Sequence, residues 1–187
     1  LSELLPAGGA GKVMDFVASG TLPNGKAVVL KSNGQVEVVA GSGSASNIPS
    51  GSLTTFEAAS SNRSQIAFDP NDGSKFVLCY VDVGNGENGT AIIGTVSGDT
   101  LSFGTPSVFN AGYTVEVSVS FDPATANQFV AVCSNQSNSS YGTSYVGTVS
   151  STSISFGSGV VFNSSGTARI NIAFSGAANT YVIVYKP

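Results

Sequence analysis

The chain has 187 residues, of which 41% are hydrophobic and only 10% charged, with a net charge of −4 at neutral pH. This much apolar material can bury a core, and the scattered Lys and Arg residues form no basic surface of the kind that a nucleic-acid backbone requires. Intrinsic disorder and nucleic-acid binding are therefore excluded, and because no apolar run reaches the roughly 18–20 residues that cross a bilayer, we expect no membrane insertion.

The chain opens with LSELLPAGGAGK at residues 1–12, which lacks the basic region that begins a signal peptide. We expect this stretch to be an N-terminal lead-in and contact segment, followed by a repeat domain over 13–187. The first unit of that domain, about 13–60, contains VMDFVASG and uses SNGQ as a two-residue hairpin turn.

A phrase in the middle of the chain occurs twice: FDPNDGSKFVLCY at 68–80 returns as FDPATANQFVAVC at 121–133. Residues of several other types keep the same interval of 53 residues, which identifies an internal repeat. The further units are predicted at about 61–112 and 113–166, with a partial unit at 167–187. The matching sets are Gly41, Gly94 and Gly147; Ile48, Leu101 and Ile154; Gly51, Gly104 and Gly157; Phe56, Phe109 and Phe162; and Phe68, Phe121 and Phe174.

Within a unit the pattern predicts four strands. VEVSVSF at 115–121 alternates apolar and polar residues, DPATANQ is a turn, and FVAVC, SYVGTVS and SISFGSGVVFN supply the other three strands. The fold class is therefore all-β, with tandem four-stranded antiparallel units of about 53 residues that are β-propeller-like. A β-sandwich or a β-solenoid built from the same hairpins is the alternative.

Several repeated residues carry structural expectations. Gly94 and Gly147 are expected where backbones approach closely or a bulge forms, and Phe109 is expected in the core between units. Cys79 aligns with Val132 and Cys133 with Tyr80, so the two thiols are predicted to face different ways and to remain free and buried rather than to form a disulfide.

No catalytic motif stands out. The chain has no histidine, which excludes Ser-His-Asp and Cys-His catalysis and removes the commonest zinc ligand. GNGENG at 84–89 matches a dinucleotide-binding spacing, but a strand rather than a helix follows it, so it is interpreted as a hairpin loop. Asp69, Asn71 and Asp72 in DPNDG are interpreted as an Asx-capped turn rather than a calcium site. We expect no enzymatic activity, no catalytic residues, no metal and no cofactor.

Two loops remain as candidate binding surfaces. DVGNGENGT at 82–90 and SNQSNSSYGT at 134–143 occupy the same place in successive units and differ in sequence. Their aromatic and amide side chains could stack on and hydrogen-bond a sugar of a cell surface, whereas the alternative is a solvated loop without a ligand. The candidate contact residues are Asn135, Asn138, Tyr141, Tyr145, Asn85 and Asn88.

The stretch GKVMDFVASGTLPNGKAVVLKSNGQVEVV at 11–39, followed by units that carry FDP, GTVS and SFG, resembles virion structural proteins of marine tailed phages, of the tail-fibre or appendage type. The resemblance implies a non-enzymatic structural or adhesive component of an extracellular virion appendage. Its expected partners are other virion structural proteins or copies of itself, with host-surface contact. The alternative function is a soluble β-propeller lectin or glycan-acting protein.

The last unit contains only the strands ARINIAF and YVIVYKP, which would leave the edge at Tyr181–Tyr185 unpaired. We expect either a continuation of the polypeptide past Pro187 with further units or neighbouring copies that supply the missing strands.

Overall fold

The structure is a computed structural model that describes residues 17–18, 28–30, 32–38, 54–98 and 100–187. These residues form β-strands and two short 3-10 turns without any α-helix, which confirms the all-β class. None of the described elements is a helix long and apolar enough to cross a membrane. The chain divides into two compact units, Leu1–Pro49 and Ser50–Pro187, and the lead-in predicted at 1–12 lies outside the described residues.

The N-terminal unit contains a small sheet in the order β1-β3-β2, formed by β1 (Val17–Ala18), β2 (Val28–Leu30) and β3 (Gln35–Val38). β2 and β3 are antiparallel and are joined through the turn predicted from SNGQ, where Gly34 has a left-handed φ of 80°. β1 pairs with β3 in parallel, which differs from the purely antiparallel unit expected from the sequence.

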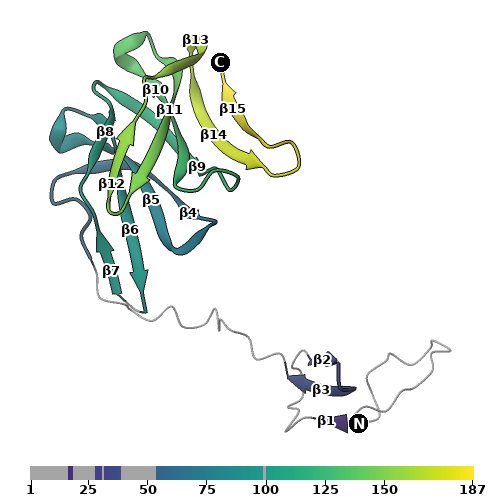
Figure 1. The fold of residues 1–187 in the computed structure, drawn as a ribbon. Coiled ribbons are helices and arrows are strands. Elements are labelled where there is room, and N and C mark those ends of the chain that lie inside the picture. Colours follow the sequence, from purple (N-terminus) through teal and green to yellow (C-terminus); the bar gives the residue numbers. More distant parts are fainter. Residues whose placement is uncertain (1–16, 19–27, 31, 39–53, 99) are drawn as a thin grey trace, which may run out of the picture. The chain divides into compact units, whose positions relative to one another are not determined.

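The C-terminal unit contains three antiparallel sheets in succession (Figure 1). The first sheet comprises β4 (Ser61–Asp69), β5 (Asp72–Asp82), β6 (Asn88–Ser97), β7 (Thr100–Phe103) and β8 (Ser107–Asn110). The second comprises β9 (Thr114–Phe121), β10 (Gln128–Asn135), β11 (Tyr141–Ser150), β12 (Ser153–Phe156) and β13 (Val160–Gly166). The third comprises β14 (Ala168–Ser175) and β15 (Thr180–Lys186).

The predicted fourth strand of each unit is divided in two. β7 and β8 both pair with β6, and β12 and β13 both pair with β11, so the expectation of one continuous strand over SISFGSGVVFN is wrong. Between β7 and β8 the Gly104 amide still donates to the Ile93 carbonyl oxygen of β6 at 2.9 Å, whereas the Thr105 amide donates to the Thr152 carbonyl oxygen of the second sheet at 3.2 Å. The second sheet divides in the same way between β12 and β13, where the Gly157 amide donates to the Val146 carbonyl oxygen of β11 at 3.0 Å.

The sheets stack face to face, and the main core lies between the first two. Val77 and Ala91 of the first sheet and Phe129 of the second are fully buried in this cluster. Phe109, predicted between units, also belongs to it. A smaller cluster joins the second sheet to the third through Val132 and residues of β14 and β15. Stacking therefore buries both faces of the middle sheet.

Cys79 and Cys133 are both buried and free, as predicted. Both belong to the main core cluster, where burial and then the proximity of Cys133 raise the pKa of Cys79. The two residues do project from opposite faces of their own sheets. When the sheets stack, however, the front face of one meets the back face of the next, and this brings the two cysteines into one layer.

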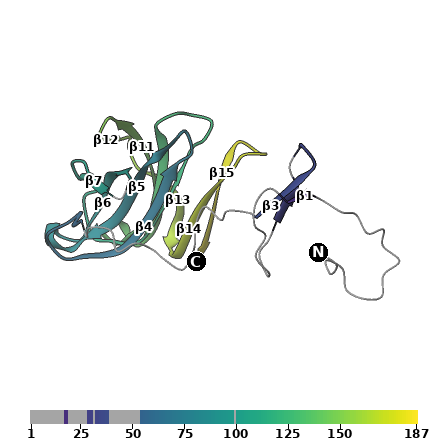
Figure 2. The same cartoon turned by 90° about the horizontal axis from the view of Figure 1, so that it is seen from below.

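The first strands of the three sheets are β4, β9 and β14. They follow one another through the stack, and β9 packs against both of the others (Figures 1 and 2). Each contains a bulge at which a non-glycine residue has a left-handed φ: 52° at Arg63, 55° at Glu116 and 53° at Arg169. Neighbours in this series are 53 residues apart, so the repeat extends to the irregular backbone conformation.

Candidate functional site

The two predicted loops have the same backbone path. The first contains the 3-10 turn η1 (Val83–Asn85) and the second η2 (Gln136–Asn138), and each turn ends in a residue with left-handed φ, 69° at Gly86 and 54° at Ser139. In the first loop the Asp82 carboxylate caps the turn by accepting from the Asn85 amide at 3.1 Å. This geometry confirms that GNGENG belongs to a strand–loop–strand connection, with its last two residues, Asn88 and Gly89, already in β6.

Both loops are fastened to the connector between the first and second sheets. The Thr114 amide donates to the Glu87 carbonyl oxygen of the first loop at 2.9 Å, and the Gln136 amide of the second loop donates to the Tyr113 carbonyl oxygen at 2.8 Å. The Tyr113 amide also donates to Ser137 Oγ at 2.9 Å. Because residues 113 and 114 bond both loops, the loops lie on the same edge of the stack.

Below this edge lies a buried polar network centred on Asn110. Its Oδ1 accepts from the Tyr145 hydroxyl at 2.9 Å and from Asn135 Nδ2 at 3.0 Å, while its Nδ2 donates to Thr114 Oγ1 at 2.7 Å. Asn135 Oδ1 is buried without a hydrogen-bond partner within the part of the chain that the structure describes. The network ties the connector, the second loop and β11 together and fixes the position of the edge.

The candidate residues divide between this edge and the core. Asn85 and Asn138 are exposed, Asn88 and Tyr141 are half-buried at the start of β6 and β11, and Asn135 is half-buried. Tyr145, in contrast, is buried, and its ring centroid lies 5.4 Å from that of Phe109. Burial raises the pKa of Tyr145 to about 12. Its core position leaves no exposed ring face for stacking on a sugar, unlike the position expected from the sequence.

One exposed aromatic residue of this edge was missed by the sequence analysis. Tyr113 has a relative exposure of 47% and lies between the two loops in sequence, and its backbone amide and carbonyl oxygen both hydrogen-bond the second loop. The sequence signal that could have identified Tyr113 is its place in the connector NAGYT, where an aromatic residue follows a strand and stands beside small polar residues. We use "polar loop edge" for the surface formed by Asn85, Glu87, Tyr113, Ser137, Asn138 and Tyr141.

Elsewhere the carboxylates of the predicted motifs hold turns. Asp69 accepts from the Asn71 amide at 2.8 Å, which confirms the Asx-capped turn in DPNDG, and Asp122 accepts from the Ala124 amide at 2.8 Å in the equivalent turn. Over the described residues, no three His, Cys, Asp or Glu side chains gather as metal ligands. These acidic groups serve the backbone locally.

No protein-family model, no curated protein and no solved structure matches the chain.

Proposed function

We propose that this protein is a non-enzymatic structural or adhesive component of a surface assembly, and that it contacts its target through the polar loop edge. The observation that carries the proposal is the pair of loops, which share backbone path and anchoring hydrogen bonds while their side chains differ. Glu87 and Asn88 of the first loop correspond to Ser140 and Tyr141 of the second. A fixed scaffold with variable loop side chains is a common arrangement for recognition.

The finer architecture that we propose is a β-propeller-like array in which each sheet is one blade. The order of strands from β4 outward to β8 recurs from β9 to β13, and β14 and β15 repeat the first two strands of the series. The packing of β9 between β4 and β14 supports an arrangement with the first strand of each blade innermost. A β-sandwich remains the alternative architecture.

The chemistry of the remaining side chains supports a binding role over an enzymatic one. Burial raises the pKa of Cys133 to about 12, which disfavours the thiolate that acts as a nucleophile. Glu57 accepts hydrogen bonds from the Ala59 amide and the Tyr80 hydroxyl, and thus braces the segment that precedes β4. These groups are engaged in packing and turn formation, which leaves the loop edge as the candidate for function.

The resemblance of residues 11–39 and of the repeated phrases to tail-fibre and appendage proteins of marine tailed phages supports placement on a virion. The partners would then be other virion structural proteins or copies of this chain, together with a host-surface glycan. A second candidate function is a soluble β-propeller lectin, which is favoured by one observation: the exposed Tyr113 lies beside polar side chains suited to sugar hydroxyls.

The test is to exchange the side chains of the two loops in the whole chain and to measure binding to marine bacterial cells and to a glycan array. Tyr113→Ala and Asn138→Ala should each weaken binding at least severalfold while the thermal midpoint stays unchanged. The matched control is Thr125→Ala, because Thr125 is exposed in the turn between β9 and β10 at the opposite end of the strands.

Binding that survives the loop variants but is lost on removal of residues 1–12 would contradict the proposal. Tight glycan binding by the isolated monomer would favour the lectin. Turnover of a glycoside or ester substrate that disappears on mutation of a single Asp or Glu would overturn the non-enzymatic assignment.

A further inference from the structure

The two internal interfaces of the stack are built from equivalent residues. Val77 and Cys79 on β5 are fully buried beneath the second sheet. Register identifies their counterparts, because Phe68 pairs with Phe76, Phe121 with Phe129 and Phe174 with Tyr181. Since Phe76 and Phe129 are equivalent, the counterparts of Val77 and Cys79 on β10 are Val130 and Val132. Val132 is fully buried beneath the third sheet.

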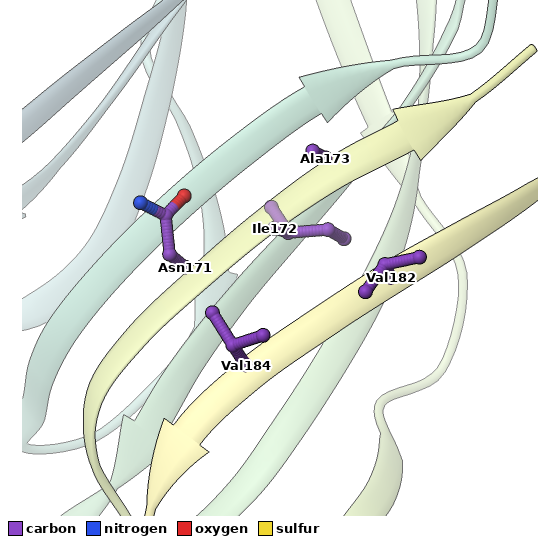
Figure 3. A pocket seen from close by; sticks show the side chains of 5 residues that line it. All are labelled: Asn171, Ile172, Ala173, Val182 and Val184. Carbon is purple, nitrogen blue, oxygen red and sulfur yellow. The ribbon is translucent and has the colours of Figure 1, made fainter.

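The corresponding residues on β15 have no such cover. Val182 and Val184 occupy the positions of Val77 and Cys79, yet they are 51% and 58% exposed. In the register they stand opposite Ala173 and Asn171 on β14. These side chains and Ile172 line a pocket of about 270 Å³ (Figure 3). We use "end face" for the surface formed by Asn171, Ala173, Val182 and Val184.

Polar contacts also cross the two interfaces beside the apolar residues, and they differ between the two interfaces. Ser118 on β9 donates through Oγ to Asn171 Oδ1 at 3.3 Å, across 53 residues of sequence. Arg63 and Glu116, at the bulges of β4 and β9, form an ion pair with Nη1 and Oε1 at 2.8 Å. The third bulge residue, Arg169, is exposed and has no ionic partner among the described residues. The series along the stack is therefore basic, acidic, basic.

We propose that the end face docks a further antiparallel β-unit of the same repeat type whose first strand carries an acidic residue at the position opposite Arg169. The apolar end face matches the faces already buried twice inside the stack, so that the incoming first strand would cover Val182 and Val184. The acidic residue of the incoming strand would follow Arg63, Glu116 and Arg169 and so continue the alternation of basic and acidic bulge residues along the stack. This inference concerns assembly and does not depend on the function of the loops.

The charge pattern distinguishes this occupant from a second copy of the chain. A second copy stacked head to tail would present β4, whose Ile66 and Phe68 are each 53% exposed and would supply apolar contact. It would also place its Arg63 against Arg169. Two guanidinium groups repel in the position where an Arg and a Glu attract inside the stack, which makes the second copy the weaker partner.

The probe for the test is the full chain carrying Arg63→Glu and Glu116→Arg, which preserves an internal ion pair while presenting an acid at the β4 end of the stack. Its own end face is blocked by Val184→Lys. The matched control probe carries Val184→Lys alone and therefore presents Arg63. Binding of each probe to the wild-type chain is measured by sedimentation velocity and titration calorimetry, after near-ultraviolet circular dichroism has shown that both probes are folded.

The acidic probe should bind the wild-type chain about tenfold more tightly than the control probe, because one exposed attraction replaces one repulsion of similar size. The difference should diminish at about 1 M salt, where the Debye length is about 3 Å. A receptor with Arg169→Glu should reverse the preference and bind the control probe more tightly.

Each other outcome overturns the proposal. Equal binding of the two probes would show that a second copy is accepted on apolar contact alone. Absence of binding by both folded probes would show that the end face is not a docking surface. A preference that persists unchanged with the Arg169→Glu receptor would locate the acid-sensitive contact elsewhere.

Discussion

Phe76 on β5 lies directly against Gly94, its partner across the ladder on β6, so that any side chain at Gly94 would overlap the aromatic ring. The next unit contains the same pair, Phe129 against Gly147. The ring of Phe76 also meets Phe103 at 88°, and that of Phe129 meets Phe156 at 89°. The repeated glycine is thus required by an aromatic side chain, whereas a close approach of backbones or a bulge was expected from the sequence.

Gly94→Ala should lower the free energy of unfolding by about 1–3 kcal/mol, since the added methyl group forces the Phe76 ring out of its position in the core. Urea denaturation measures the change. Gly73→Ala is the control, because a Cβ at Gly73 meets no atom within 4 Å. An equal loss of stability in both variants would point to a general backbone effect and contradict the packing explanation.

The ion pair between Arg63 and Glu116 should contribute only about 0.2–1 kcal/mol, because their side chains are 49% and 33% exposed. A double-mutant cycle with Arg63→Gln and Glu116→Gln measures this coupling, which should fall as salt is added. A parallel cycle with Arg169→Gln in place of Arg63→Gln should give a coupling near zero. A larger coupling for Arg169 would mean that Glu116 pairs with the opposite neighbour.

The bulge residues should tolerate small and flexible side chains better than β-branched ones. At Arg169, with φ of 53°, substitution by Val should cost about 1–2 kcal/mol because the left-handed region is unfavourable for a β-branched residue. Arg169→Asn and Arg169→Gly should be neutral or stabilising. Chemical denaturation of the three variants gives the ranking, and a neutral Val would indicate that the bulge rearranges.

Stability should fall at alkaline pH. Burial raises the pKa of Cys133, Tyr145 and Tyr181 to about 12 each, so the folded state retains protons that the unfolded state releases. The contribution of these groups is fully present below the unfolded-state pKa values of about 8.5 for a thiol and about 10 for tyrosine, and it is lost as the pH rises toward 12.

Thermal melting between pH 8 and pH 11 tests this expectation, with Cys133→Ala as the variant that should show a shallower decline. In the folded wild type, neither Cys79 nor Cys133 should react with a thiol reagent at pH 8, and both should react in denaturant. Rapid labelling of the native protein at pH 8 would contradict the buried, protonated state of the two thiols.

Much of the fold could be predicted from the sequence because its signals are local and recur. Alternation in VEVSVSF identifies a strand, and the Asp-Pro pair identifies the turn that follows, since the carboxylate of Asp122 can cap the backbone only two residues away. The interval of 53 residues then relates the strands of one unit to those of the next without reference to any contact.

The candidate site could be predicted only in part for the same reason. The two loops were identified from their equivalent places in the repeat, but burial of Tyr145 depends on Phe109 and Asn110, which belong to the preceding unit. Exposure of Tyr113 depends likewise on how the connector lies between the loops. The alternation of residues in a strand predicts which side chains share one face of the sheet, but it does not predict what covers that face.

By itself, then, the amino-acid sequence determined the strand content, the period of the repeat and the positions of the turns, all of which depend on interactions between near neighbours. Only the tertiary structure decided that Cys79 and Cys133 share one layer, that Arg63 meets Glu116, and that the Thr105 amide bonds to the next sheet. These features depend on the stacking of one unit on another, which brings opposite faces together and is not encoded in the alternation of any single strand.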